Sequence, residues 1–145
     1  MEVPTYVSAD EVKLICTKLG IRDWSALKDL EVSSDEAGAI LSMVAGEARL
    51  IPIDDFRDGL QVELEHGIRF PDANVTNNHP ILTGKIVLAH LKESLLYYKR
   101  IAVMELEGDV LKAVKLSDGE KLRELHQRLS RARVLLYESE SGELR

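Results

Sequence analysis

Apolar residues recur at helical spacing along most of the chain, separated by short polar or glycine-containing segments. The first such stretch has a capping box, because Ser8 is followed by Glu11, and it is closed by Gly20. A helix is therefore predicted over residues 9–19. Its expected inner face comprises Val12, Ile15, Cys16 and Leu19.

The same signals predict the next helices. Segment 21–30 favours a short helix that carries Trp24 inward, and a second capping box at 33–36 begins a helix that should end near Gly46. Pro52 interrupts the pattern. Asp54 or Asp55 is then a natural cap for a helix that ends near residue 67.

In the second half of the chain, a polar loop precedes a helix that begins at Pro80, with Asn78 or His79 as its cap. The apolar residues that follow either continue this helix or begin another after a break near Ser94. A third capping box at 117–120 opens a helix to Tyr137. These signals predict an all-α fold, an irregular bundle of about six or seven helices.

Length and composition predict one domain. The chain has 145 residues, of which 45% are hydrophobic and 30% charged, so a single helical domain is expected over 1–137, with a polar tail over 138–145. Cys16 is the only cysteine, which excludes an internal disulfide. Neither a membrane-spanning run nor a signal-peptide pattern is found, so a cytoplasmic protein is expected. The net charge of −6 makes nucleic-acid binding a poor interpretation.

Carboxylates and imidazoles fall on the expected inner faces of the middle helices. Helix phase places Glu63 and His66 inward, His90 on an inner face one turn from Glu93, and Glu105 on the face of Ile101. Buried polar groups need partners. They therefore form either a purely structural hydrogen-bonded network or a functional site.

The functional interpretation has two forms. Glu-x-x-His and His-x-x-Glu spacings put both side chains on one helical face, as in carboxylate-bridged metal sites. A divalent metal would then be held by Glu63, His66, His90 and Glu105. Alternatively, Glu63 and His90 act as a metal-free acid and base. In the loop, Asn74 and Thr76 either complete the turns or orient a bound ligand.

Four words of the sequence, VELEHG, NVT, TGKIVLAHL and YY, occur in this order within residues 56–106. This segment, 55–107 with its flanks, resembles a family of small bacterial, archaeal and phage proteins classed as a domain of unknown function. The resemblance implies no activity, but it includes Tyr98 among the pattern residues, as a further ligand-binding candidate. Phage relatives would also imply a virion-associated role.

The helix predicted over 117–137 has a narrow apolar seam, flanked by basic residues. Its members are Leu122, Leu125, Leu129, Ala132 and Leu136. Such a seam packs either on its own domain or against another protein, in a homo-oligomer or with a different partner. The sequence therefore predicts a small structural or interaction module. The alternative is a metal-dependent enzyme or a small-ligand-binding protein.

Overall fold

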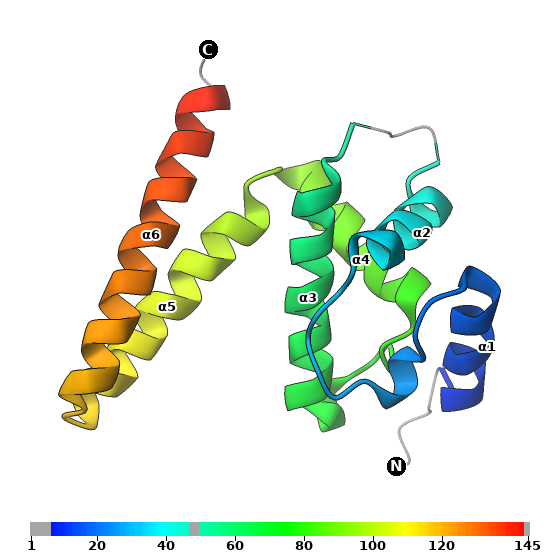
Figure 1. The fold of residues 1–145 in the computed structure, drawn as a ribbon, viewed down its shortest axis with the longest axis horizontal. Helices are drawn as coiled ribbons and strands as arrows, with labels where there is room; N and C mark the ends of the chain where they lie inside the picture. The colour runs from blue at the N-terminus through cyan, green and yellow to red at the C-terminus, as the bar shows by residue number, and fades with distance from the viewer. Residues whose placement is uncertain (1–6, 47–49, 144–145) are drawn as a thin grey trace. The chain divides into compact units, whose positions relative to one another are not determined.

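The structure is a computed structural model that describes residues 7–46 and 50–143. These residues form helices and no strands, which confirms the all-α prediction (Figure 1). Two short 3-10 helices, η1 and η2, lie between the α-helices. The elements are α1 Ala9–Leu19, η1 Trp24–Ala26, α2 Ser34–Val44, α3 Ile53–Arg69, η2 Pro71–Ala73, α4 Pro80–Glu93, α5 Tyr97–Lys115 and α6 Gly119–Glu143.

The chain divides into two compact units, Met1–Leu95 and Leu96–Arg145. The first contains α1 to α4 and the second contains α5 and α6. The break between them begins near Ser94, which ends α4 in an extended conformation. A break at this residue is one of the two alternatives that the sequence leaves open. The segment predicted as the family-like core, 55–107, begins in the first unit and ends in the second.

The core of the first unit lies where α2, α3 and α4 pack together (Figure 1). Ile40, Phe56 and Val87 are fully buried there. A Cβ added at Gly84 would lie only 2.6 Å from Ile40 Cγ2 and 3.4 Å from Phe56 Cζ. Gly84 therefore allows α4 to approach α2 closely.

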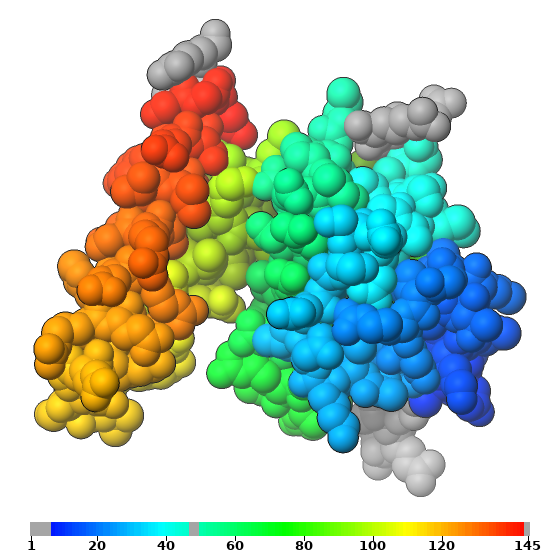
Figure 2. Space-filling model, viewed as in Figure 1, coloured from blue at the N-terminus to red at the C-terminus, as the bar shows by residue number. Residues whose placement is uncertain are grey.

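The segment between α1 and α2 contains only a single helical turn. The sequence predicts a short helix over 21–30, whereas η1 covers Trp24–Ala26 and Leu27 is extended. Just after this segment, Val32 N donates to Gln61 Oε1 on α3 at 3.2 Å, which ties the chain to α3. The segment accordingly runs across the surface beside α3 (Figure 2).

The second unit is a hairpin of α5 and α6, which contact each other along their lengths. Arg133 of α6 pairs with Glu107 of α5 at 2.6 Å, and Arg100 of α5 pairs with Glu140 of α6 at 2.8 Å. Residues 138–143 are therefore helical, although the sequence predicts them as part of a polar tail. The ion pair joins Glu140 to Arg100, a residue far away in the sequence, so the local composition of the tail does not reveal it.

The turn of this hairpin corrects the third predicted capping box. Ser117 has a φ of 55° and follows the end of α5, where Asp118 N donates to Ala113 O at 3.1 Å. This is the Schellman arrangement. The cap of α6 is instead Asp118, whose Oδ1 accepts from Lys121 N at 3.0 Å. Ser117 thus terminates one helix and does not begin the next.

The apolar seam of α6 faces α5 of the same chain. Leu125 and Leu129 are buried, and Leu122, Ala132 and Leu136 are half-buried. Within the chain, the seam therefore packs on α5, the other arm of the hairpin, as in the first of the two alternatives left open by the sequence.

Candidate functional site

Helix α3 supplies the first side chains of the candidate site. Its buried face is formed by Phe56, Gly59, Leu60 and Leu64. Glu63 lies at the margin of this face, with a side chain 19% exposed, and His66 is 51% exposed. Their Oε2 and Nδ1 atoms lie 4.0 Å apart. The predicted pairing on one helical side is thus found, but the predicted burial of His66 is wrong because it projects from the last turn.

The loop after α3 is held by Asn74. Its Nδ2 donates to Gly67 O at 3.2 Å and to Asn78 Oδ1 at 2.8 Å, while its Oδ1 accepts from Thr76 Oγ1 at 3.2 Å. A Cβ at Gly67 would overlap Asn78 Oδ1 and lie 2.8 Å from Asn74 Nδ2. Gly67 and Asn74 therefore form a matched pair that fixes this loop on α3.

A pocket of about 190 Å³ lies between the end of α3, this loop and α4. Four of the residues predicted from the sequence as site residues line it: Glu63, His66, Asn74 and Thr76. The remaining wall is formed by Gly67, Phe70, Ala73, Val75, Thr83 and Ile86. The structure thus brings together the VELEHG and NVT words of the sequence. The pocket combines one carboxylate, one imidazole and several small polar groups with apolar side chains.

Thr83 is the most buried polar residue of this wall. It is 3% exposed, and within the part of the chain that the structure describes its hydroxyl has no hydrogen-bond partner. Every fully enclosed side-chain N or O atom in that part does have a partner. The Thr83 hydroxyl oxygen is therefore not fully enclosed, and Thr83 is one of the residues that line the pocket. Sequence reasoning included Thr83 in the family pattern but did not assign it to the site.

His79 begins the helix that carries Thr83. Its Nδ1 accepts from Leu82 N at 3.4 Å, so His79 is the N-cap of α4, one of the two predicted alternatives. Burial lowers the pKa of His79, and the nearby Glu11 carboxylate opposes this shift only in part. The lowered pKa favours the neutral imidazole, which is the form that can accept this bond.

The other predicted site residues lie elsewhere. His90 is half-buried on α4 and does not line the pocket. Tyr98 and Glu105 belong to the second unit, where Tyr98 is buried and Glu105 is exposed, so the predicted burial of Glu105 is wrong. Over residues 7–46 and 50–143, no three His, Cys, Asp or Glu side chains are grouped to hold a metal ion. The set Glu63, His66, His90 and Glu105 stays a prediction.

The buried charge of the first unit is Glu36, which sequence reasoning treated only as part of a capping box. Its carboxylate accepts from Arg22 Nε at 3.0 Å, from Trp24 Nε1 at 3.3 Å and from Ser33 N at 3.0 Å. Burial alone would raise the pKa of Glu36, but bonds from Arg22, Ser33 and Trp24 outweigh it and lower the pKa to about 2. This cluster is satisfied internally, so its role is structural.

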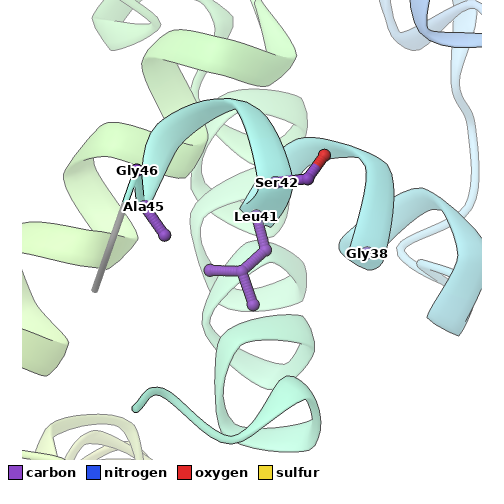
Figure 3. Close-up of a pocket in the computed structure, with 5 residues that line it drawn as sticks. All are labelled: Gly38, Leu41, Ser42, Ala45 and Gly46. Atoms are coloured by element: carbon purple, nitrogen blue, oxygen red, sulfur yellow. The ribbon is translucent and has the colours of Figure 1, made fainter. Parts of the chain in front are cut away.

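A second hollow lies along the C-terminal half of α2 and has a volume of about 340 Å³. The close-up shows Leu41 and Ser42 projecting from this helix, with Ala45 and Gly46 at its end (Figure 3). Its described lining residues carry no titratable side chain. The pocket beside α3 is smaller, yet it holds the groups capable of specific polar recognition.

The model of a family described as "Protein of unknown function (DUF5661)" matches residues 12–107. The chain belongs to this family. The match contains every residue that lines the pocket beside α3. No curated protein and no solved structure matches the chain. None of the helices in the described ranges is long and apolar enough to cross a membrane.

Proposed function

We propose that the first unit of this DUF5661 protein is a binding module for a small polar ligand, held in the pocket beside α3. The observation that carries the proposal is the convergence of Glu63, His66 and Thr83 on one pocket from two different helices. Ligand sites combine an apolar wall with a few placed polar groups, and this pocket has that composition.

The loop contributes to the proposed site by its position. Asn74 uses both of its amide hydrogens and its oxygen within the protein. It is therefore assigned the role of holding the loop, while Thr76 and Val75 form the pocket wall. A rigid wall lowers the entropy lost on binding.

The test is a titration of the full chain with a set of small polar compounds, followed by backbone amide chemical shifts. Saturable shifts confined to residues around 63–76 and 83–86 are expected. Glu63→Gln should weaken binding, whereas Glu93→Gln should leave it unchanged, because Glu93 is exposed on α4 and lies outside the pocket. Shifts that were equally affected by both substitutions, or that lay outside the pocket, would contradict the proposal.

A second candidate function is self-association through the second unit. The seam of α6 packs on α5, and a partner contact through helix 117–137 stays a prediction. The outer face of α5 does carry large exposed apolar side chains seven residues apart, since Met104 is 58% and Leu111 56% exposed. A heptad spacing suits packing against the same helix of a second copy.

Self-association predicts that the wild-type chain forms a larger particle than a variant with charged residues on the outer face of α5. Light scattering coupled to size exclusion should give a dimer that Met104→Glu with Leu111→Glu converts to a monomer. A control pair on the exposed surface of the first unit, Lys13→Glu with Lys18→Glu on α1, should leave the dimer intact. A monomeric wild-type chain at high concentration would end this hypothesis.

We also propose a cytoplasmic location, as the sequence suggests. Its support is Cys16, a buried and unpaired thiol of the kind found in reducing compartments. Burial raises the pKa of this thiol, which keeps it unreactive. A virion-associated role stays a prediction.

A further inference from the structure

The outer face of α5 repeats with the period of a coiled coil. Met104 and Leu111 are seven residues apart and are 58% and 56% exposed. In coiled-coil notation they occupy position d. A second series with the same spacing occupies position a on the same side of the helix: Ile101, Gly108 and Lys115. This side differs from the one that carries Tyr98 and Ala113, the residues that α5 buries.

Gly108 lies at the centre of the outer face and leaves room for a second helix. It is exposed, and a Cβ added to it would meet no atom within 4 Å. Glycine inside a helix is destabilising relative to alanine, but it lets another backbone approach closely. The outer face thus combines two large apolar side chains with a point of close approach between them.

The residues that flank this face carry alternating charges. Arg100 and Glu107 occupy position g on one flank, while Glu105 and Lys112 occupy position e on the other. In a parallel pair of helices, each g residue meets the e residue five positions later on the other helix. Arg100 would then meet Glu105 of a second copy. Glu107 would likewise meet Lys112, so the flanks of α5 are complementary to a parallel second copy of α5.

The same charges disfavour an antiparallel pair. In that arrangement, g residues meet g residues and e residues meet e residues. With Gly108 at the centre, Glu107 of one copy would lie beside Glu107 of the other, which is a repulsion. Glu105 and Lys112 would still attract each other. All charge pairs are therefore attractive in the parallel arrangement, whereas the antiparallel one sets attraction on one flank against repulsion on the other.

Three of these charged side chains also form ion pairs within the chain. Glu107 pairs with Arg133 at 2.6 Å, and Arg100 also pairs with α6. Lys112 pairs with Asp109 at 2.8 Å. Ion pairs on the surface are weak, and an ionised group can bond to more than one partner. The Glu107 and Lys112 side chains are 50% and 75% exposed, so a second copy can add contacts to those already made.

We infer that α5 pairs in parallel with α5 of a second copy, with Met104 and Leu111 in the shared core. Glu107 and Lys112 set the orientation, and Lys115 is a polar residue at position a of the kind that fixes register. The inference rests on the second candidate function, self-association, because it names the surface and the orientation of the partner.

Charge reversal tests this orientation. Sedimentation equilibrium of the full chain gives the dimer dissociation constant of each variant. Glu107→Lys should weaken the dimer about tenfold, because its contacts with Lys112 become repulsive, and Lys112→Glu should weaken it to a similar extent. The double variant, Glu107→Lys with Lys112→Glu, should restore the wild-type dissociation constant. An equimolar mixture of the two single variants should also associate as tightly as the wild type.

Arg133→Gln is the matched control for the ion pair within the chain. It removes the partner of Glu107 from the α6 side and leaves the charges of α5 unchanged, so it should not weaken the dimer. Thermal unfolding of each variant confirms that it is folded.

The outcomes distinguish the orientation from self-association itself. Suppose that Glu107→Lys leaves the dimer unchanged, that Lys112→Glu weakens it and that the double variant does not restore it. The pair is then antiparallel, which overturns the inference while self-association stands. A dimer that no charge reversal affects forms through another surface and also overturns the inference. A wild-type chain that stays monomeric at high concentration overturns both the inference and the second candidate function.

Discussion

Glu36 concentrates the electrostatic interactions of the first unit in one side chain. It is buried and joins Arg22 and Trp24 to the start of α2. We predict that Glu36→Gln lowers the free energy of unfolding by about 1–2 kcal/mol, because it weakens the charge-assisted bonds to Arg22 and Ser33, while Arg22, 43% exposed, keeps solvent and Asp29 as partners. Urea denaturation measures this. Asp35→Asn, at an exposed neighbouring position, should change stability by less than about 0.5 kcal/mol.

The same carboxylate makes stability depend on acid. The pKa of Glu36 is about 2 in the folded protein and its ordinary value is 4.5. A lowered pKa gives stability that is complete above pH 4.5 and is lost as the pH falls toward 2, because the unfolded chain takes up the proton first. Unfolding free energies measured between pH 6 and 2.5 should therefore fall more steeply for the wild type than for Glu36→Gln. Parallel curves would show that other carboxylates dominate.

Gly67 is a second residue whose identity is fixed by its neighbours. A side chain there would collide with Asn74 and Asn78, so Gly67→Ala should destabilise the protein by about 1–3 kcal/mol. It should also disturb the pocket wall. The matched control is Gly38→Ala, also in a helix but facing open space, which should be neutral or stabilising by up to about 1 kcal/mol. Thermal unfolding of both variants checks the difference in sign.

At the scale of elements, helix caps were the most informative sequence signals. Capping boxes at Ser8 and Ser33 are both present in the structure, and they begin α1 and α2 as predicted. Ser117 gave the same signal but lies in the left-handed region after α5. A cap motif and a helix-ending turn share polar residues, and only the bond from Asp118 to Ala113 distinguishes them.

This turn supports a prediction of its own. α1 ends on Gly20 with a φ of 68°, whereas α5 is followed by Ser117 with a φ of 55°. Glycine adopts this conformation without the steric cost that a Cβ brings. Ser117→Gly should therefore stabilise the hairpin by about 1 kcal/mol, and the reciprocal Gly20→Ser should destabilise the first unit by a similar amount. Denaturant unfolding of the two variants tests the pair, and stabilisation by Gly20→Ser would refute the argument.

Only part of the candidate site could be predicted from the sequence, namely the residues that lie close together on one helix. Glu63 and His66 share one helix, so phase alone placed them on one side. The contribution of Thr83 depends on how α4 packs across α3, and Glu36 depends on a loop that returns Arg22 to α2. Such contacts are set by tertiary packing, which a periodic pattern does not encode. The prediction that His66 is buried was wrong because His66 lies in the last turn of α3, where the helix leaves the core.

At the scale of the whole molecule, the two units differ in how much they bury. In the first unit Trp24, Phe56 and Leu60 are fully buried, together with other large side chains. Along the hairpin Val114, Val134 and Tyr137 are more than half exposed. Regions with few buried apolar contacts open at lower free energy. Stability should therefore be distributed unevenly along the chain.

Hydrogen exchange followed by mass spectrometry tests this distribution. Amides of α5 and α6 should exchange faster than those of α3 and α4, with the difference greatest near the hairpin turn. Leu129→Ala removes a side chain that is 5% exposed and should cost the hairpin about 2–3 kcal/mol, accelerating exchange in α5 and α6. Leu135→Ala, at an exposed position of the same helix, serves as the control. Equal protection of the α3 and α5 amides in the wild type would contradict this prediction and mean that the hairpin gains stability from contacts beyond its own seam. Repeating the exchange at a lower protein concentration would then test whether self-association supplies those contacts.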